Sequence, residues 1–567
     1  MATLARYLVF GIALVVASCA APQRPLAEQR PAAEPQRPGV VKRVTIAILG
    51  DAPQLYNSIG AASGSDDVAE ELVNRGLVEA DDTRVFLPVL AEAIPTIENG
   101  LWKLFPDGRM ETTWRIKPGA EWHDGAPYTA DDLVFTLRAS MDPELPLVIR
   151  PAFASIESVT APDPRTVTVR WARPFIDADK LFSREMALPL PRHLLERAAA
   201  EDKANFANLP YWTEEFVGTG PFKVKETLLG TPALLQANDR YVLGRPKIDE
   251  IELRVFADPN TLAASILSDT VDLVLGRGFD FDQAMVVESQ WRGGRVETRF
   301  SGTMAIYTQL VGRTPPVIGE VQFRRALLHA VDRQQMIDVL MNGRSTIAHS
   351  FLGSNEPEYP DAESSLVRYE YDPRRAAQLI EGLGYTRGPD GIYRDAANQR
   401  LSVEIRAEQG QTEEKSSLAV ADYWQQAGVG VETTVAPRQR ARDLEYQYTF
   451  PAFNLRGQSS RIAAGLSNYQ GSQSPYPENR WVGNNRGRYV NPELDAAIDR
   501  YVVTIPIRER VQELQTIVRL ITDQLPIMNL FYSVQFTLIA NRVENMVPVK
   551  GSGTAGKTWN SQLWDVK

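Results

Sequence analysis

Only one stretch of this chain is apolar over a length that raises the question of a membrane, and it lies at the N-terminus. Residues 7–16 read Tyr-Leu-Val-Phe-Gly-Ile-Ala-Leu-Val-Val, with Arg6 shortly before them and Ala17-Ser18 after them. A positive residue, a short apolar core and small residues at its end are typical of a secretory signal peptide, and the run is too short for a transmembrane helix. We therefore expect residues 1–18 to be a signal peptide, and the rest of the chain to bury its apolar side chains within its own fold.

The only cysteine, Cys19, follows this run directly. Its position after Val16-Ala17-Ser18 resembles the lipobox of bacterial lipoproteins, in which the chain is cut before the cysteine and the thiol is acylated. A chance cysteine in a plain signal peptide is the alternative. Five prolines between residues 22 and 38 remove backbone donors. We expect residues 19–43 to be a lipidated N-terminus and an extended tether that hold the protein at the periplasmic or outer cell surface.

Length and composition exclude several classes of protein. A chain of 567 residues exceeds what one hydrophobic core usually supports, so two or more lobes are expected. The net charge of −10 opposes a nucleic-acid-binding surface. One cysteine and four scattered histidines argue against a metal site, and no G-x-S-x-G, H-E-x-x-H or Walker loop is present. We expect neither a cofactor nor an enzyme.

Strand and helix patterns alternate beyond residue 44. Short β-type runs occupy 45–49, 166–170, 251–255 and 401–405. Helix signals are a capping box formed by Thr129 and Asp132, an apolar face over 323–331 followed by a cap at Asp332, and helix openings at Asp372-Pro373 and Asn491-Pro492. The mixture predicts an α/β protein.

Residues 114–135 read WRIKPGAEWHDGAPYTADDLVF. This stretch resembles the signature of family 5 extracellular solute-binding proteins, the dipeptide-, oligopeptide- and nickel-binding components of ABC importers. Further phrases keep the family order: Gly76-Leu77-Val78-Glu79, Pro88-Val89-Leu90-Ala91-Glu92, Gly218-Thr219-Gly220-Pro221-Phe222, Asn238-Asp239-Arg240-Tyr241, Arg325-Ala326-Leu327, Ala330-Val331-Asp332-Arg333 and Tyr489-Val490-Asn491-Pro492.

The resemblance implies a two-lobe periplasmic binding protein of type II, in its large three-domain variant, with the ligand cleft between the lobes. Lobe I would comprise residues 44–305, with an extra subdomain at 76–217, and lobe II residues 306–524; residues 525–567 would return to lobe I. The implied function is capture of a peptide or peptide-like solute by hinge closure and its delivery to an ABC permease. Permease and ATPase subunits would be separate chains, and the binding protein a monomer. An oligosaccharide or acidic opine-like solute, or a role as solute sensor or chaperone, remains the alternative.

His123 and Asp124 invite a catalytic interpretation as a base and its orienting acid. No nucleophile or second base accompanies them, so we expect them to brace a hairpin, with Asp124 bonding its own turn.

The ligand-binding residues are harder to place. Peptide binders of the family commonly carry a Trp and an Asp in lobe II, and the Asp neutralises the peptide's α-ammonium group, whereas residues 451–461 of this chain contain neither. Arg456 instead offers a planar donor fork for a carboxylate or phosphate, and Asn454 and Gln458 alternate with it on one face. A solvated Arg456, or one paired with a structural Glu, is the alternative. Aromatic candidates for ligand contact, against a simple packing role, are Tyr56, Trp212, Tyr469 and Trp481.

Overall fold

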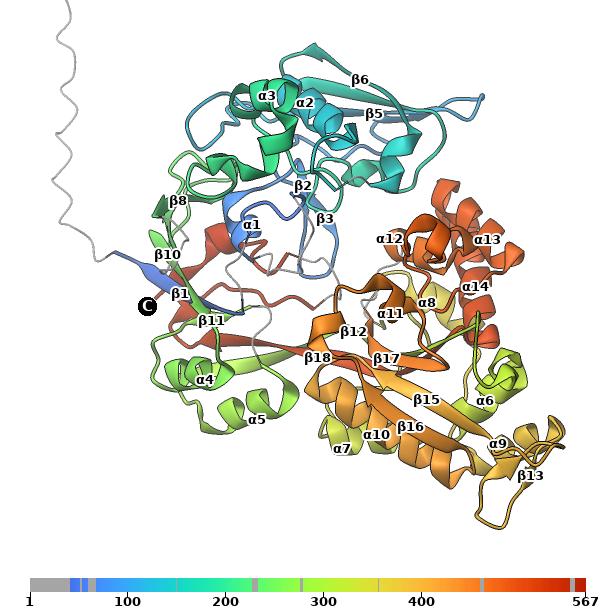
Figure 1. Cartoon of the computed structure of the whole chain (residues 1–567). Helices are drawn as coiled ribbons and strands as arrows, with labels where there is room; N and C mark the ends of the chain where they lie inside the picture. Colours follow the sequence, from blue (N-terminus) through green and yellow to red (C-terminus); the bar gives the residue numbers. More distant parts are fainter. Residues whose placement is uncertain are drawn as a thin grey trace, which may run out of the picture. The chain divides into compact units, whose positions relative to one another are not determined.

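Two long antiparallel strands, β12 and β18, run through the middle of a ten-stranded sheet in the computed structural model (Figure 1). The structure describes residues 41–50, 54–59, 68–148, 150–226, 233–275, 279–354, 356–458, 463–550 and 556–567. The proposed signal peptide, Cys19 and most of the tether lie outside these residues. No helix in the described ranges is long and apolar enough to cross a membrane.

The strands are β1 (Arg43–Leu49), β2 (Val78–Ala80), β3 (Phe86–Pro88), β4 (Trp102–Leu104), β5 (Met110–Arg115), β6 (Ile156–Asp163), β7 (Thr166–Trp171), β8 (Phe222–Glu226), β9 (Ala233–Ala237), β10 (Glu250–Phe256), β11 (Leu273–Val274), β12 (Gly294–Thr308), β13 (Thr386–Arg387), β14 (Tyr393–Arg394), β15 (Ser402–Ala407), β16 (Gly430–Val435), β17 (Phe453–Gln458), β18 (Ile527–Ala540), β19 (Val543–Glu544) and β20 (Asp565–Val566). The α-helices are α1 (Val68–Val73), α2 (Ala130–Met141), α3 (Arg192–Glu201), α4 (Pro259–Leu267), α5 (Phe281–Gln290), α6 (Val321–His329), α7 (Arg333–Leu340), α8 (Tyr359–Ala362), α9 (Pro373–Gly382), α10 (Gln411–Gln426), α11 (Leu444–Tyr448), α12 (Ala463–Leu466), α13 (Pro492–Val503) and α14 (Ile507–Gln524).

The large sheet has the strand order β16-β15-β17-β12-β18-β11-β1-β10-β9-β8. Strand β1 is parallel to β10 and β11, and β15 is parallel to β16 and β17. Between these two parallel groups, β12 pairs with β17 at one end, while β18 pairs with β11 at its opposite end. The two long strands therefore connect the two halves of the sheet. Their pairing is interrupted by register shifts at Phe300/Gly302 and Met304/Ala305.

A separate four-stranded sheet, β4-β5-β7-β6, forms the centre of the segment in which the extra subdomain was expected. Its own apolar core includes the fully buried Trp114 and Trp171. Helix α2 begins at Ala130, and the Asp132 carboxylate accepts hydrogen bonds from the backbone N–H and the hydroxyl of Thr129. These bonds confirm the predicted helix start.

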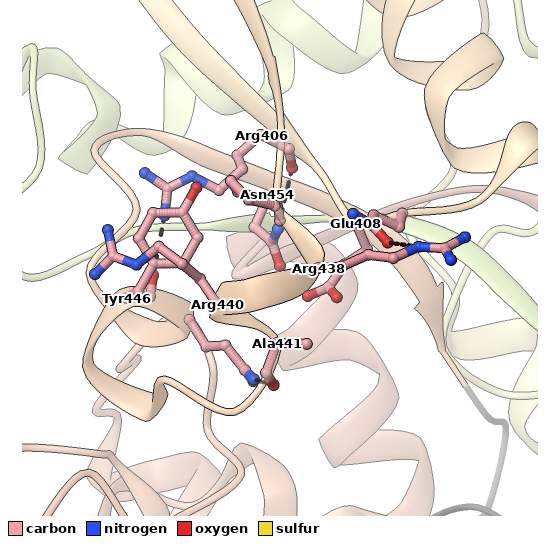
Figure 2. Close-up of a pocket in the computed structure, with 11 residues that line it drawn as sticks. Arg406, Glu408, Arg438, Arg440, Ala441, Tyr446 and Asn454 are labelled. Carbon is pink, nitrogen blue, oxygen red and sulfur yellow. Dashed lines mark hydrogen bonds between the residues drawn. The ribbon is translucent and has the colours of Figure 1, made fainter.

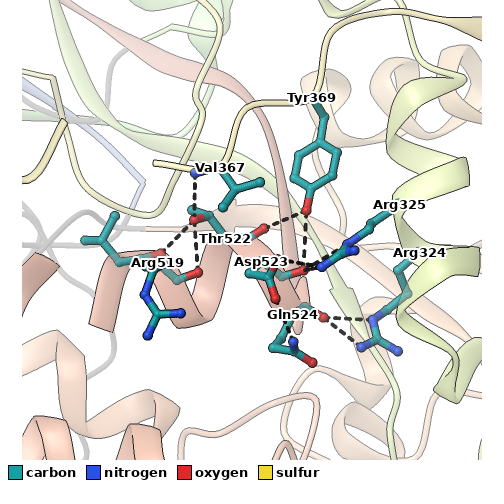
Figure 3. A network of polar contacts seen from close by, with 9 residues as sticks. Arg324, Arg325, Val367, Tyr369, Arg519, Thr522, Asp523 and Gln524 are labelled. Atoms are coloured by element: carbon teal, nitrogen blue, oxygen red, sulfur yellow. Dashed lines mark hydrogen bonds and ion pairs between the residues drawn. The ribbon is translucent and has the colours of Figure 1, made fainter. Parts of the chain in front are cut away.

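The end of α14 and the start of β18 are held by arginines of α6 and α7, of which Figure 3 shows the two from α6, Arg324 and Arg325. Arg324 donates to the Gln524 carbonyl from Nε and Nη2, at 3.0 and 2.7 Å, and Arg325 donates to the Asp523 carbonyl. Arg333 donates to the Asn529 carbonyl of β18. A helix leaves its last carbonyls unpaired, so cationic donors there satisfy them and stabilise the helix dipole. Arg325 and Arg333, which belong to two of the motifs that resemble the family, thus hold the end of α14 and the start of β18 in place.

Most predicted elements are confirmed. The four expected strand runs correspond to β1, β7, β10 and β15, each within two residues of the predicted bounds. Asp332 caps α7 by accepting from the Gln335 N–H, and Asn491 caps α13. The helix opened by Asp372-Pro373 runs from Pro373 to Gly382. The expected boundary between residues 305 and 306 falls inside β12, and the lobe boundaries remain predictions.

Candidate functional site

Charged and polar side chains gather at the carboxyl ends of β15 and β17, on the face of the sheet opposite α10. Phe453 and Leu455 are fully buried on the α10 side, and the Phe453 ring lies 5.0 Å from that of Trp424 in α10. Because side chains alternate along a strand, Asn454 and Arg456 project from the other face. Ligands of α/β lobes commonly bind at this carboxyl edge of a parallel sheet.

A pocket of about 100 Å³ opens beside these strand ends (Figure 2). Its walls come from the end of β15, from the segment after β16, from α11 and from Asn454. The charged residues that line it are Arg406, Glu408, Arg438 and Arg440. Three guanidinium groups against one carboxylate give a net positive lining, in a chain whose net charge is −10.

Two of these arginines are held in place by Tyr446. The guanidinium carbons of Arg406 and Arg440 lie 4.2 and 3.9 Å from the centre of the Tyr446 ring. Arg406 also donates to the Tyr446 carbonyl at 2.9 Å, and Arg440 pairs with Asp443 at 2.6 Å. A guanidinium over an aromatic face gains electrostatic attraction, so these charges are positioned without a ligand.

Arg456 and Arg486 share one acid, Glu408. The Nη1 atoms of the two arginines lie 3.5 and 3.4 Å from the same oxygen, Oε1 of Glu408. The Arg456 side chain is 33% exposed, whereas that of Arg486 is only 8% exposed. Burial, followed by the neighbouring charge of Arg456, lowers the pKa of Arg486 to about 10. The alternative interpretation of the sequence, in which Arg456 pairs with a glutamate, therefore agrees with its contact with Glu408.

Gln458 links two tyrosines next to this pair. The Tyr307 hydroxyl donates to Oε1 of Gln458 at 3.0 Å, and Nε2 of Gln458 donates to the Tyr469 hydroxyl at 2.5 Å. Asn454 donates to the Arg406 carbonyl at 3.0 Å. Four of the residues selected from the sequence, Asn454, Arg456, Gln458 and Tyr469, therefore belong to one connected group. Their contact with a ligand stays a prediction.

Trp481 lies apart from that group in the described residues. Its half-buried ring stands 5.9 Å from the guanidinium of Arg488, which in turn donates to Gln309 and to the Val311 carbonyl. These contacts give Trp481 a packing role in this conformation and leave ligand contact a prediction.

Tyr56 and Trp212 pack together in the large core. Their ring centres are 5.4 Å apart, the Tyr56 hydroxyl donates to the Leu188 carbonyl, and the Trp212 indole donates to the Phe206 carbonyl. Both side chains are almost fully buried with their polar atoms satisfied. In the turn that follows Trp212 along the chain, a Cβ on Gly218 or Gly220 would collide with the backbone of Val73. The small residues there are explained by chain packing and give ligand contact no support.

The arrangement of His123 and Asp124 agrees with a bracing role. Nδ1 of His123 accepts from the Gly218 N–H at 3.1 Å, and Nε2 lies 3.0 Å from the Gly220 carbonyl. Asp124 accepts from the N–H of Ala126 in its own turn, as predicted, and contacts His193 at 2.7 Å. Burial lowers the pKa of His123 to about 4. Both ring nitrogens are thus occupied by backbone groups.

In the ranges that the structure describes, no three His, Cys, Asp or Glu side chains are placed to hold an ion together.

Sequence reasoning missed Arg406, Glu408, Arg440, Tyr307 and Arg486. The basic run Arg438-Gln439-Arg440-Ala441-Arg442 was a usable signal for the pocket wall, because cations concentrated in an acidic chain indicate an anionic partner. Arg486 carries no local signal, since it is brought to β17 only by the fold.

The fold is that of a type II periplasmic binding protein. The oligopeptide-binding protein AppA of Bacillus subtilis, solved with a nonapeptide, aligns with a TM-score of 0.69 and 20% identity over 93% of this chain and 99% of AppA. AgaA of A. tumefaciens R10, solved with agropinic acid, aligns with a TM-score of 0.68 and 19% identity over 93% of this chain and 99% of AgaA.

The chain belongs to family 5 of the bacterial extracellular solute-binding proteins. The model of that family, described as its middle part, matches residues 88–474. A Brucella ovis protein named as an ABC transporter peptide-binding protein is 29% identical over 308 residues, which are 53% of this chain and 54% of the relative. The match thus spans about half the length of that relative.

Proposed function

We propose that the protein is the substrate-binding component of an ABC importer, which captures a peptide or peptide-like solute and delivers it to a membrane permease. The observation that carries the proposal is the pocket with a net positive lining at the carboxyl ends of β15 and β17. These two strands belong to a sheet whose halves are connected by β12 and β18. The Brucella ovis relative and AppA, both named as peptide-binding proteins, support the peptide.

The mechanism is closure of the two halves on the solute. A ligand that contacts both halves only in the shut form shifts the equilibrium toward that form by its differential affinity. The interrupted pairing of β12 with β18 supplies a place for the bend. The closed form would be the one that the permease recognises.

The proposal also covers the arrangement of the lobes and the attachment of the protein to a membrane. Lobe I comprises 44–305 with the subdomain 76–217, lobe II comprises 306–524, and 525–567 returns to lobe I. Acylated Cys19 anchors a monomer at the outer side of a membrane, and permease and ATPase are separate chains.

A second candidate ligand is a non-peptide acid. The arginine-lined pocket favours it, and AgaA with agropinic acid is a structural neighbour that holds such a compound. The same closure mechanism would serve this solute.

Native mass spectrometry of protein purified from its own envelope fraction tests the proposal, because an enclosed solute survives gentle purification. We expect a bound species of peptide-like mass. Adding it back to emptied protein should reduce the radius of gyration and add about 2.7 kcal/mol of stability at a hundredfold excess over Kd. Recovery of the solute in altered form over many turnovers would instead place the protein among enzymes.

A further inference from the structure

We propose that Arg456 and Arg486 together form a receptor for a carboxylate group of the captured solute. This inference rests on the proposed function and specifies the chemistry of the same site. Arg486 is the principal residue, and its role follows from how it is placed against Glu408, Asn454 and Gln447.

The first observation is that the shared acid is bound loosely. Charged hydrogen bonds between Arg and a carboxylate usually measure about 2.7–2.9 Å. Elsewhere in this protein Arg542 pairs with Asp272 at 2.6 Å and Arg344 with Glu288 at 2.7 Å. The two contacts to Oε1 of Glu408, at 3.5 and 3.4 Å, are both much longer. One carboxylate oxygen therefore serves two cations and compensates neither fully.

The second observation is that donors remain unused. All three hydrogen bonds of Arg486 to described residues come from Nη1, to Glu408, the Gln447 carbonyl and Oδ1 of Asn454. Arg456 uses Nη1 and, toward the Gly457 carbonyl, Nε. Within the described part of the chain, Nε and Nη2 of Arg486 and Nη2 of Arg456 are left for another acceptor. Nε and Nη2 form one edge of the guanidinium, and a planar carboxylate matches that edge with two parallel hydrogen bonds.

The third observation is the surplus of positive charge around the pair. Arg406, Arg438 and Arg440 line the adjoining pocket. The acids nearby are already engaged or weakened. Glu404 and Asp443 pair with Arg406 and Arg440. Burial raises the pKa of Glu413, which follows the end of β15, and so opposes its ionisation. A cationic solute group would be repelled here.

Two tyrosine rings lie close to the Arg486 guanidinium. The guanidinium carbon of Arg486 lies 5.1 Å from the Tyr448 ring centre and 5.9 Å from that of Tyr307. The rings limit how Arg486 can rotate, so its free edge is preorganised. Preorganised donors lose less conformational entropy when a ligand binds.

The test uses two pools of random tetrapeptides without Asp or Glu, one with a free terminal carboxylate and one with a terminal amide. Their affinities for the full protein, measured by calorimetry, should differ at least tenfold in favour of the acid pool. Arg486→Gln should remove this preference, and the exposed control Arg500→Gln, which breaks only a pair with Glu513, should retain it.

Glu408→Gln gives a second test, in which we expect stronger binding instead of weaker binding. This test leaves both arginines in place. Removing the acid that occupies both arginines should strengthen binding of the acid pool severalfold. A purely structural role for Glu408 predicts weaker binding or none.

The outcomes separate this inference from the proposed function. Equal binding of both pools would overturn the carboxylate receptor and leave peptide capture standing. If neither pool binds, the proposal of peptide capture fails. The carboxylate receptor is then tested by comparing linear dicarboxylic acids with their diamides. Preference for the acids supports the receptor, and equal or absent binding overturns it. Stronger competition by inorganic phosphate than by acetate would also overturn the assignment to a carboxylate.

Discussion

Arg84 and Glu356, 272 residues apart in the chain, form an ion pair in which the acid is almost completely buried. Arg84 lies in the turn between β2 and β3, and Glu356 lies shortly before α8. A second link joins the same regions, because the Ile176 N–H donates to the Val502 carbonyl of α13 at 3.1 Å. The segment that holds the four-stranded sheet is therefore tied to the helices of the C-terminal half at points outside the two connecting strands.

Arg84→Met should destabilise the protein by about 3–5 kcal/mol, because it removes a guanidinium that pairs with the buried Glu356 carboxylate. The side chains of Arg84 and Glu356 are only 13% and 1% exposed, so solvent screens the pair weakly. Urea unfolding measures the change. The double variant Arg84→Met/Glu356→Leu should recover part of the loss, and Arg109→Met, which breaks the exposed pair with Asp107, should leave stability nearly unchanged. Equal losses of stability in Arg84→Met and Arg109→Met would contradict the burial of the Arg84–Glu356 pair.

Arg456→Ala should weaken solute binding more than tenfold while barely changing the melting temperature of the empty protein. The side chain is one-third exposed and its contact with Glu408 is long, so little folding energy depends on it. Arg456→Lys should rescue binding only in part, because an ammonium group cannot form the two-pronged contact. Titration calorimetry with the solute recovered from the native protein measures both variants. Unchanged affinity with lower stability would show that Arg456 serves structure alone.

His123 should make the protein less stable in acid. Burial lowers its folded-state pKa to about 4 from the ordinary 6.5. Between these two pKa values His123 is protonated in the unfolded chain but neutral in the folded chain. The free energy of unfolding therefore falls as the pH drops from about 6.5 to 4, by up to about 3 kcal/mol. Nδ1, which accepts from the Gly218 N–H, is the nitrogen that would have to be protonated.

His123→Gln tests this assignment, since a glutamine amide offers both an acceptor and a donor without titrating. Urea unfolding at pH 7 and pH 4.5 should show a smaller loss of stability for the variant than for the native protein. Other groups contribute equally to both, so the difference isolates His123. Identical losses would assign the acid sensitivity elsewhere.

Cys19→Ser should release the protein from membranes. The apolar run and the single cysteine predict acylation at this position, and serine cannot form the thioether. Fractionation of cells that produce each form measures the effect, with the native protein in the membrane pellet and the variant in the soluble envelope fraction. A variant that still sediments wholly with membranes would rule out the lipid anchor.

The sequence predicted the local elements well because their causes are local. Asp332 and Asn491 cap the helices that follow them, and the alternation through Asn454, Arg456 and Gln458 places the three on one face. A cap or a strand alternation involves residues at most a few positions apart, so it can be read before the fold is known.

The site was predicted only in part because its other members are brought together by long-range pairing. Tyr307 and Arg486 reach Gln458 and Asn454 from other segments of the chain. Tyr56 and Trp212 show the converse problem. They were chosen as candidates for ligand contact, with simple packing as the alternative, and close packing against the core buries both rings.

The register shifts between β12 and β18 have a consequence for the rate at which the protein could open and close. The proposed bend would lie between Phe300 and Ala305 of β12 and the facing residues 529–534 of β18, where the pairing is already irregular. In the proposed mechanism, opening and closing would then be a local event in this pair of strands, and the backbone amides there should exchange with deuterium more slowly once a solute holds the protein shut. The exchange rate at those few amides would report how long each captured molecule stays inside.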